Sequence, residues 1–186
     1  MSKVAVQGNA SGTGTLTIAA PNTNTDRTLT LPDEAGTVLT TATPGVPVNG
    51  PAFSAYASSG VTMTSSYTRY KITLNNTLFD TNSDFDAVNH RFMPSVAGYY
   101  IITGSAATTG TAVTRSHIYK NGSAAVSGAV QSTTGFGGAA STASCVIYCN
   151  GTSDYVELYI ESQTAGQTSG TSSTSVYLTG ALVRAA

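Results

Sequence analysis

Charged residues are scarce in this chain of 186 residues, since Asp, Glu, Lys and Arg make up only 9% of it. A typical soluble domain carries roughly a quarter. The formal net charge is −1, and no run of Lys or Arg occurs anywhere in the sequence. Because a protein that binds nucleic acid must neutralise several phosphates with clustered cations, the composition argues against a nucleic-acid partner.

Strong helix formers are also few, and Ser, Thr and Gly occupy much of the sequence in their place. These residue types favour strands and turns over helices. Hydrophobic residues still make up 40% of the chain, which is enough for a buried core. We therefore expect an all-β protein.

Long apolar runs are absent from the sequence. None reaches the roughly 18 residues that a membrane-spanning helix requires. Residues 1–6 also lack the apolar stretch of a secretory signal. We expect no membrane insertion, and we expect a chain that is made and assembled in the cytoplasm and leaves it by lysis, if at all.

Cysteine is limited to Cys145 and Cys149. On one strand these residues would lie about 13 Å apart at ~3.3 Å per residue. A disulfide requires Cα atoms within about 7 Å, so the pair cannot form one there. No further Cys or His stands at a metal-binding spacing. We expect two small buried apolar residues without a chemical role.

Residues 1–42 have the pattern of short strands separated by turns. Polar and apolar residues alternate over residues 13–19 and 27–31, and a third strand is expected over residues 37–40. A meander of this size buries too little apolar surface to be stable alone. We therefore predict that it is an attachment arm, and that it packs on a partner through Leu16, Ile18, Leu29, Leu31 and Val38.

Residues 43–51 contain three prolines and predict an extended linker, which places the start of a second domain at residue 52. This domain, residues 52–186, has roughly ten short β-branched or aromatic runs, the pattern of a sandwich or jelly roll. Asn121-Gly122 predicts a two-residue hairpin turn. Asn150-Gly151 predicts a second such turn, between strands at residues 144–148 and 155–160.

From Pro51 onward the sequence resembles the globular heads of the complement and tumour-necrosis-factor superfamily. The most specific motif is the Phe-x-Pro-x-x-x-Gly-x-Tyr pattern over residues 92–100. The Lys-Asn-Gly hairpin at residues 120–122 and the closing strand at residues 175–182 match in the same order. The resemblance implies a jelly-roll head that forms a homotrimer and has no enzymatic activity and no cofactor.

Aromatic residues are numerous, with ten Tyr and five Phe but no Trp. Tyr suits an interface because its ring buries area while its hydroxyl stays hydrogen-bonded. Core packing and the trimer interface both remain open as their location. The candidates for either role are Phe53, Phe85, Phe92, Tyr100 and Tyr177.

Residues 8–15 and 28–38 resemble a segment common in phage tail-fibre and virion-appendage proteins. This resemblance implies a location at the virion surface, with the arm bound to other virion proteins. Together the two resemblances imply a trimeric jelly-roll head preceded by a small N-terminal β-meander arm.

The sequence offers little for catalysis. The two histidines, His90 and His117, are not accompanied by a Gly-x-Ser-x-Gly nucleophile elbow. We expect His90 in a solvated loop or strand edge and His117 in a strand, either satisfied or exposed. A shared ion bound by three copies of His117 on a trimer axis is the weaker alternative.

The acidic residues do not form a recognisable catalytic or metal site either. Asp80, Asp84 and Asp86 share an oxygen-rich loop of the kind calcium prefers, but it lacks the glutamate and glycine of a calcium loop. Glu157 and Glu161 would lie about 13 Å apart on one strand face, farther than the roughly 9.5 Å limit of glycosidase pairs. We predict no catalytic residue, no metal and no cofactor.

Two functions remain open. In one, the chain is a short tail fibre or surface appendage whose head loops contact a host cell-surface glycan or protein. In the other, it is a capsid decoration trimer that stabilises the head shell through its arm. A secreted lectin or signalling trimer fits less well without a signal sequence. The receptor-loop candidates are Thr109, Thr111, Gly135, Phe136 and Gln167.

Overall fold

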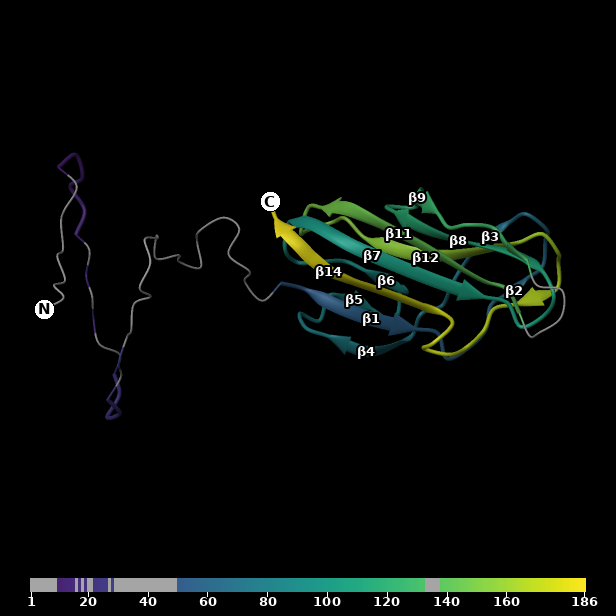
Figure 1. Ribbon diagram of the computed structural model, residues 1–186, viewed down its shortest axis with the longest axis horizontal. Helices are drawn as coiled ribbons and strands as arrows, with labels where there is room; N and C mark the ends of the chain where they lie inside the picture. Colours follow the sequence, from purple (N-terminus) through teal and green to yellow (C-terminus); the bar gives the residue numbers. More distant parts are fainter. Residues whose placement is uncertain are drawn as a thin grey trace, which may run out of the picture. The chain divides into compact units, whose positions relative to one another are not determined.

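The computed structural model describes residues 10–15, 17, 19, 22–26, 28, 50–132 and 138–186 (Figure 1). The chain divides into two compact units, Met1–Val38 and Leu39–Ala186. In the first unit the described residues are exposed, and the N–H of Thr25 donates to Oγ1 of Thr23 at 3.1 Å. The arm meander stays a prediction, because its predicted contact residues lie outside the described ranges: Leu16, Ile18, Leu29, Leu31 and Val38.

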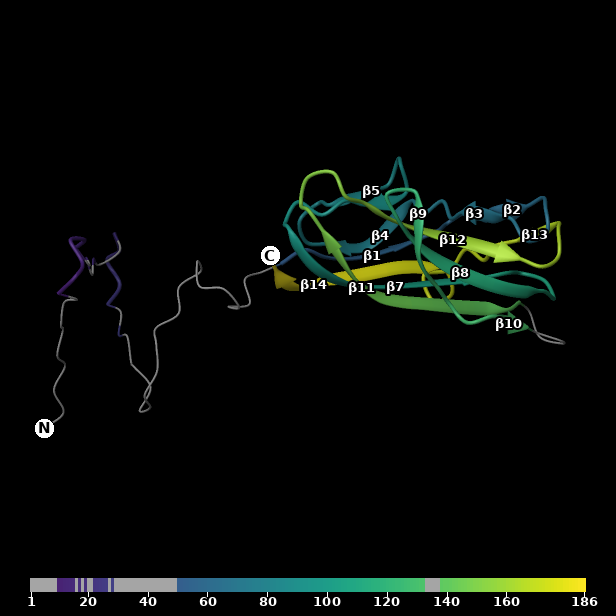
Figure 2. The ribbon, with the colours of Figure 1, turned by 90° about the horizontal axis from the view of Figure 1, so that it is seen from above.

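The second unit is built on two antiparallel sheets. The described residues form strands, turns and loops only, and none of them belongs to a helix that could cross a membrane. Figure 2 shows β14, β7 and β11 of the first sheet running side by side along the head. In spatial order, the first sheet consists of β11 (Ala140–Cys149), β7 (Gly98–Ala107), β14 (Tyr177–Ala185), β1 (Ala52–Tyr56) and β4 (Asn76–Asp80).

The second sheet has seven strands. Its main path runs through β10 (Gln131–Ser132), β8 (Val113–Lys120), β12 (Val156–Ser162), β6 (Arg91–Phe92) and β5 (Phe85–Asp86), with β3 (Arg69–Lys71) paired to β12 and β9 (Ser123–Ser127) to β8. Two short strands, β2 (Thr62–Met63) and β13 (Gln167–Thr168), pair with each other. Chain neighbours often lie in different sheets, so the chain crosses repeatedly between the layers. The prediction of an all-β sandwich is confirmed.

An aromatic stack joins the two sheets. Phe53 of β1 and Phe92 of β6 are fully buried, and their ring centroids lie 3.9 Å apart. Tyr100 of β7 meets the Phe92 ring edge-on at 5.6 Å, and its hydroxyl donates to the carbonyl of Val96 at 2.7 Å. Because this hydroxyl has a partner, the ring can be buried without an unsatisfied donor.

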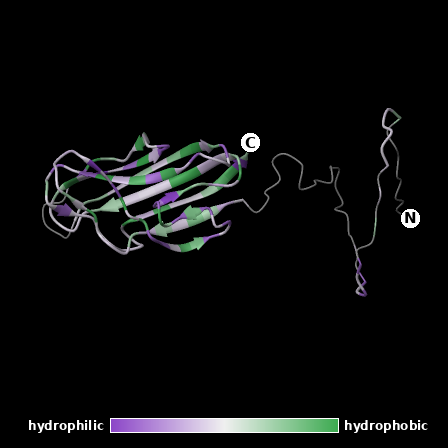
Figure 3. Cartoon of the chain, turned by 180° about the vertical axis from the view of Figure 1, so that it is seen from behind, coloured by the Kyte–Doolittle hydropathy of each residue, from purple (hydrophilic) through white to green (hydrophobic). Residues whose placement is uncertain are grey.

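Aliphatic residues from both layers lie around the stack. Buried and exposed residues alternate along strands such as β7, and Figure 3 shows hydrophobic positions, in green, on the strands of the head. Phe85 packs against this core, with its ring 5.7 Å from that of Phe53. Tyr177 lies on the opposite face of its sheet, because its neighbour Leu178 is fully buried. Three of the five candidate aromatics are therefore core residues, Phe85 packs against the core, and Tyr177 lies on the other face of its sheet.

The β8–β9 hairpin turns at Asn121 and Gly122, with φ of 50° and 76°, as the sequence predicts. The prediction of a second two-residue turn at Asn150-Gly151 is wrong. β11 and β12 belong to different sheets, and the six residues 150–155 connect them. Oδ1 of Asn150 accepts the backbone N–H groups of Thr152, Ser153 and Asp154 at 2.9–3.0 Å, so the side chain builds the wider turn.

The two cysteines both lie on β11, as predicted. Cys149 is fully buried and Cys145 is half-buried, and both are free thiols. Burial raises the pKa of the Cys149 thiol to about 11, so it stays protonated and unreactive near neutral pH.

Candidate functional site

The outward face of the five-stranded sheet carries a group of exposed apolar side chains. Tyr99 and Ile101 of β7 lie directly opposite Tyr148 and Val146 of β11. Val183 of β14 joins them beside a bulge in the β7–β14 ladder. These five residues, which we call the apolar patch, are between 40% and 62% exposed. Contiguous exposed apolar surface of this kind marks an interaction site in soluble proteins.

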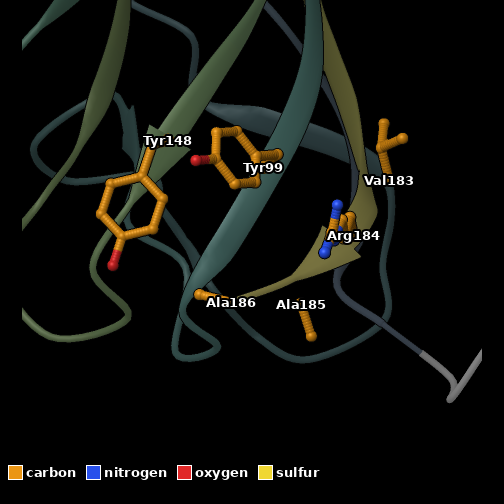
Figure 4. A pocket seen from close by; sticks show the side chains of 6 residues that line it. All are labelled: Tyr99, Tyr148, Val183, Arg184, Ala185 and Ala186. Carbon is orange, nitrogen blue, oxygen red and sulfur yellow. The ribbon is translucent and has the colours of Figure 1, made fainter. Parts of the chain in front are cut away.

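A depression of roughly 520 Å³ lies within the apolar patch (Figure 4). The rings of Tyr99 and Tyr148 stand on one side of it, with centroids 5.4 Å apart. Val183, Arg184 and the last two residues of the chain form the rest of its lining. The surface is therefore apolar, with one guanidinium at its edge.

Farther along the same face of the five-stranded sheet, the side chains carry hydroxyl groups. Oγ1 of Thr103 and Oγ of Ser144 lie 2.9 Å apart across β7 and β11. Oγ1 of Thr179 donates to the carbonyl of Phe53 at 2.8 Å. These hydroxyls are satisfied within the sheet, so they can be covered by another surface at little desolvation cost.

The predicted receptor loops meet at one end of the head. Both the backbone N–H and Oγ1 of Thr109 donate to the carbonyl of Thr168, at 2.9 and 3.2 Å. Thr109 and Thr111 are exposed, and Gln167 in β13 is half-buried against Gly110. Gly135 and Phe136 lie outside the described residues. The structure thus brings three of the five predicted loop residues together.

This end is the one opposite the entry of the chain into the head. The N–H of Leu182 donates to the carbonyl of Pro51 at 2.9 Å, so the head begins beside its own C-terminal strand. In Figure 1 the C-terminus and the start of β1 lie at one end of the head, and β2 lies at the other, where β13 pairs with it.

A network of ion pairs covers the outward face of the seven-stranded sheet. Nε of Arg69 lies 3.3 Å from Oε2 of Glu161, and Lys71 pairs with Glu157. The rings of Tyr119 and Tyr159 stack between these pairs at 4.0 Å. The two glutamates therefore hold strands β3 and β12 together.

His117 lies at the centre of this network and is fully buried. Its Nδ1 is hydrogen-bonded to Oγ of Ser127 at 2.8 Å. Its Nε2 lies 3.4 Å from Oε2 of Glu161, but in a direction that makes no hydrogen bond. Burial, followed by the positive charge of Arg69, lowers the pKa of His117 below its usual 6.5, so the ring is neutral at pH 7.

Ser127, His117 and Glu161 have the residue types of a hydrolytic triad, which the sequence search did not find. The contact between the histidine and the glutamate is not a hydrogen bond. The N–H of Gly128, next to Ser127, donates to the carbonyl of Ser116 at 2.8 Å and so is not free to hold an oxyanion. The geometry therefore supports a structural role for these residues.

The other polar candidates also serve turns. Nδ1 of His90 lies 2.8 Å from the carbonyl of Leu74. The Asp80 carboxylate accepts the backbone N–H groups of Asp84 and Phe85, and that of Asp86 accepts the N–H of Asn89 at 2.9 Å. In the described part of the chain no three His, Cys, Asp or Glu residues are placed to share a metal ion.

No protein-family model matches the chain, and no curated protein matches it. Solved structures do match, and they show the fold of the head, an all-β jelly-roll sandwich. The particular structures include murine APRIL at pH 5.0, with 9% identity and a TM-score of 0.57 over 72% of this chain and 99% of that chain. Murine APRIL at pH 8.0 gives a TM-score of 0.56, also at 9% identity.

The globular domain of the zebrafish complement 1qA protein is 19% identical, with a TM-score of 0.49 over 73% of this chain and 99% of that one. The likeness to APRIL establishes the predicted jelly-roll fold of the head.

Proposed function

We propose that this chain is a non-enzymatic structural protein of a phage virion, which forms a homotrimer, attaches through its N-terminal arm and contacts a host surface receptor with its head. The observation that carries the proposal is the apolar patch on the five-stranded sheet. The arm sequence and the position of the loops support its other parts.

The patch supports a trimer because it is apolar and exposed on the outward face of a sheet. Tyr99, Tyr148 and Val146 would be removed from water if two neighbouring copies packed against this face. The satisfied hydroxyls of Thr103 and Ser144 beside them would be covered without leaving a donor unpaired. Heads of the superfamily that this sequence resembles associate around a three-fold axis through such strand faces.

The ends of the head support the attachment role. The linker enters at Pro51, and Thr109 and Gln167 lie at the opposite end. The loops at that far end of the head are the part that we propose contacts the receptor. Loops on a rigid sandwich are the usual location of binding residues, and three copies would turn a weak contact into an avid one.

Adsorption of the fluorescently labelled full chain to host cells tests this proposal. A receptor-binding appendage is expected to bind the cells and to compete with phage adsorption. Deleting residues 1–42 should leave cell binding unchanged and should abolish incorporation into particles.

A capsid decoration protein would behave differently in the same experiments. The chain would ignore host cells, and particles lacking it would lose their contents at a lower temperature. That pair of results would replace the receptor-binding proposal with the decoration alternative, in which the arm adds strands to neighbouring capsid subunits.

A further inference from the structure

A second depression, of roughly 290 Å³, lies on the seven-stranded sheet, away from the apolar patch. Its lining comes from the start of β8, the end of β12 and the segments before β3 and β10. Tyr67, Arg115, Val130, Glu161 and Gln163 are the lining residues that matter here. The volume lies just below the range of roughly 300–1,000 Å³ for small-molecule sites, so a ligand here would be no larger than a single sugar ring.

Arg115 is a cation without an anion. Arg69, Lys71, Arg91 and Lys120 each pair with a carboxylate, whereas Arg115 makes no ion pair and no hydrogen bond with the described residues. It is half-buried, and its Nε is buried without a partner. A guanidinium stays charged at any physiological pH, so an anion bound in the depression would give Arg115 the partner that the described residues do not supply.

The nearest carboxylate in register cannot complete it. Glu161 is the cross-strand neighbour of Arg115, but its carboxylate is already paired with Arg69 at 3.3 Å. The Nε2 of His117, on the same sheet face, is also buried and without a hydrogen bond. The depression is therefore lined by one guanidinium without a partner and one carboxylate that is already paired.

The walls of the depression indicate which other groups the ligand would carry. The ring of Tyr67 is 65% exposed, and Val130 is 50% exposed on the other segment. Tyr67 adopts a left-handed backbone conformation, with φ of 55°, and its N–H donates to the carbonyl of Ser162 at 2.8 Å. A non-glycine residue in this region is strained, so the sheet holds the exposed ring in place against a cost.

We propose that this depression binds a carboxylated sugar residue, such as a uronic acid. The guanidinium of Arg115 would pair with the carboxylate in a two-pronged contact. The ring of Tyr67 would lie against the C–H face of the sugar, and the amide of Gln163 would bind its hydroxyls. A monoanion fits better than a phosphate dianion, because the committed charge of Glu161 lies next to the site.

The depression borders the end of the head that would face a host. Oγ1 of Thr114, in its lining, lies 3.3 Å from Oγ1 of Thr108, where the loop with Thr109 begins. The N–H of Gln163 donates to the carbonyl of Val113 at 2.9 Å. That the sugar belongs to a host surface polysaccharide rests on the proposed function, whereas the binding of the sugar itself does not.

Titration of the full chain with glucuronic acid, followed by calorimetry or NMR, tests the site. We expect saturable binding with a millimolar dissociation constant, and at least tenfold weaker binding of glucose and of inorganic phosphate. Arg115→Gln should weaken glucuronic acid binding at least tenfold. Arg115→Lys should weaken it less, because lysine keeps the positive charge but cannot bind both carboxylate oxygens with two parallel N–H groups.

Arg91→Gln is the matched control, since it removes the same residue type from the same sheet and should leave the affinity unchanged. Thermal melts of each variant confirm that it is folded. The proposal is overturned if the wild type does not bind glucuronic acid at about 50 mM, tenfold or more above the expected constant. Equal binding of glucose or phosphate, or unchanged binding by Arg115→Gln, would overturn it too.

Failure of the proposed function gives a different result. If host cells are not bound while glucuronic acid binding is lost in Arg115→Gln, the sugar site stands and the receptor role falls. If cells are bound equally by the wild type and Arg115→Gln while glucuronic acid is not bound at all, the receptor role stands and the sugar site falls.

Discussion

At the residue scale, His117 connects the interior of the sheet to its charged surface. It is fully buried, neutral at pH 7 and surrounded by Arg69, Arg115 and Glu161. Alternation along the strand indicates that residues 115, 117 and 119 share a face, but nothing in the sequence indicates that Ser127 and Glu161 meet His117 there. Those contacts depend on which strands are neighbours in the sheet, and local sequence patterns do not predict the order of strands.

The depressed pKa of His117 predicts a loss of stability at mildly acidic pH. The unfolded chain takes up a proton at His117 near pH 6.5, whereas the folded chain does so only at lower pH. The free energy of unfolding should therefore fall as the pH drops below about 6.5, with a limiting slope of about 1.4 kcal/mol per pH unit. Urea denaturation at a series of pH values between 7 and 5 measures this slope.

His117→Asn should flatten that slope, whatever it does to stability at pH 7. If His117→Asn kept the same dependence of the free energy of unfolding on pH, titration of His117 would not be the cause of that dependence. Asp86 and Asp154 do not interfere in this window, because hydrogen bonds hold their carboxyl pKa values below the usual 3.8.

At the element scale, Asp154 holds two turns together. Its Oδ1 accepts the side-chain amide of Asn121 at 2.7 Å, and its Oδ2 accepts the N–H of Asn150 at 3.0 Å. Lys120 pairs with the same oxygen at 2.8 Å. The carboxylate thus links the β8–β9 hairpin to the connection between β11 and β12.

Asp154→Ala is expected to destabilise the fold by about 2–4 kcal/mol, because it leaves several donors without a charged acceptor. Urea denaturation at pH 7 measures the effect. Asp26→Ala, at an exposed position of the N-terminal unit, is the control and should change stability by less than about 0.5 kcal/mol.

The pH dependence gives a second check on Asp154. Its carboxyl pKa is lowered in the fold, mainly by Lys120 and Asn121, so its contribution is present above pH 3.8 and is lost as the pH falls below that value. Equal stabilities of the wild type and Asp154→Ala at pH 7 would contradict the account of these turns.

Much of this element-scale structure could be predicted from the sequence. The strands around residues 144–148 and 155–160 and the Asn121-Gly122 hairpin follow from β-branched and aromatic runs and from turn chemistry. The Asn150-Gly151 turn could not be predicted, because an Asn-Gly pair is equally compatible with a wider turn built by the asparagine side chain. Whether two successive strands share a sheet depends on the whole topology.

At the scale of the whole molecule, the head was predictable and its surface was not. The motif over residues 92–100 indicates a jelly roll, but it leaves open whether Phe92 and Tyr100 lie in the core or at an interface, and the structure places both in the core. The apolar patch could not be located from the sequence, because Tyr99 and Tyr148 are equally compatible with the core. Only the pairing register of β7 and β11 shows which face of the sheet they occupy. The arm remains a prediction.

The central claim is that the apolar patch joins three copies of the chain, and the mass of the full chain in solution tests it most directly. Light scattering should give about 57 kDa, three times the 18.9 kDa of one chain. Val146→Asp should reduce the mass to that of one chain, whereas Val88→Asp, at an 85% exposed position outside the patch, should leave it unchanged. A wild-type mass of 18.9 kDa, or a Val146→Asp variant that keeps the full mass, would contradict the account.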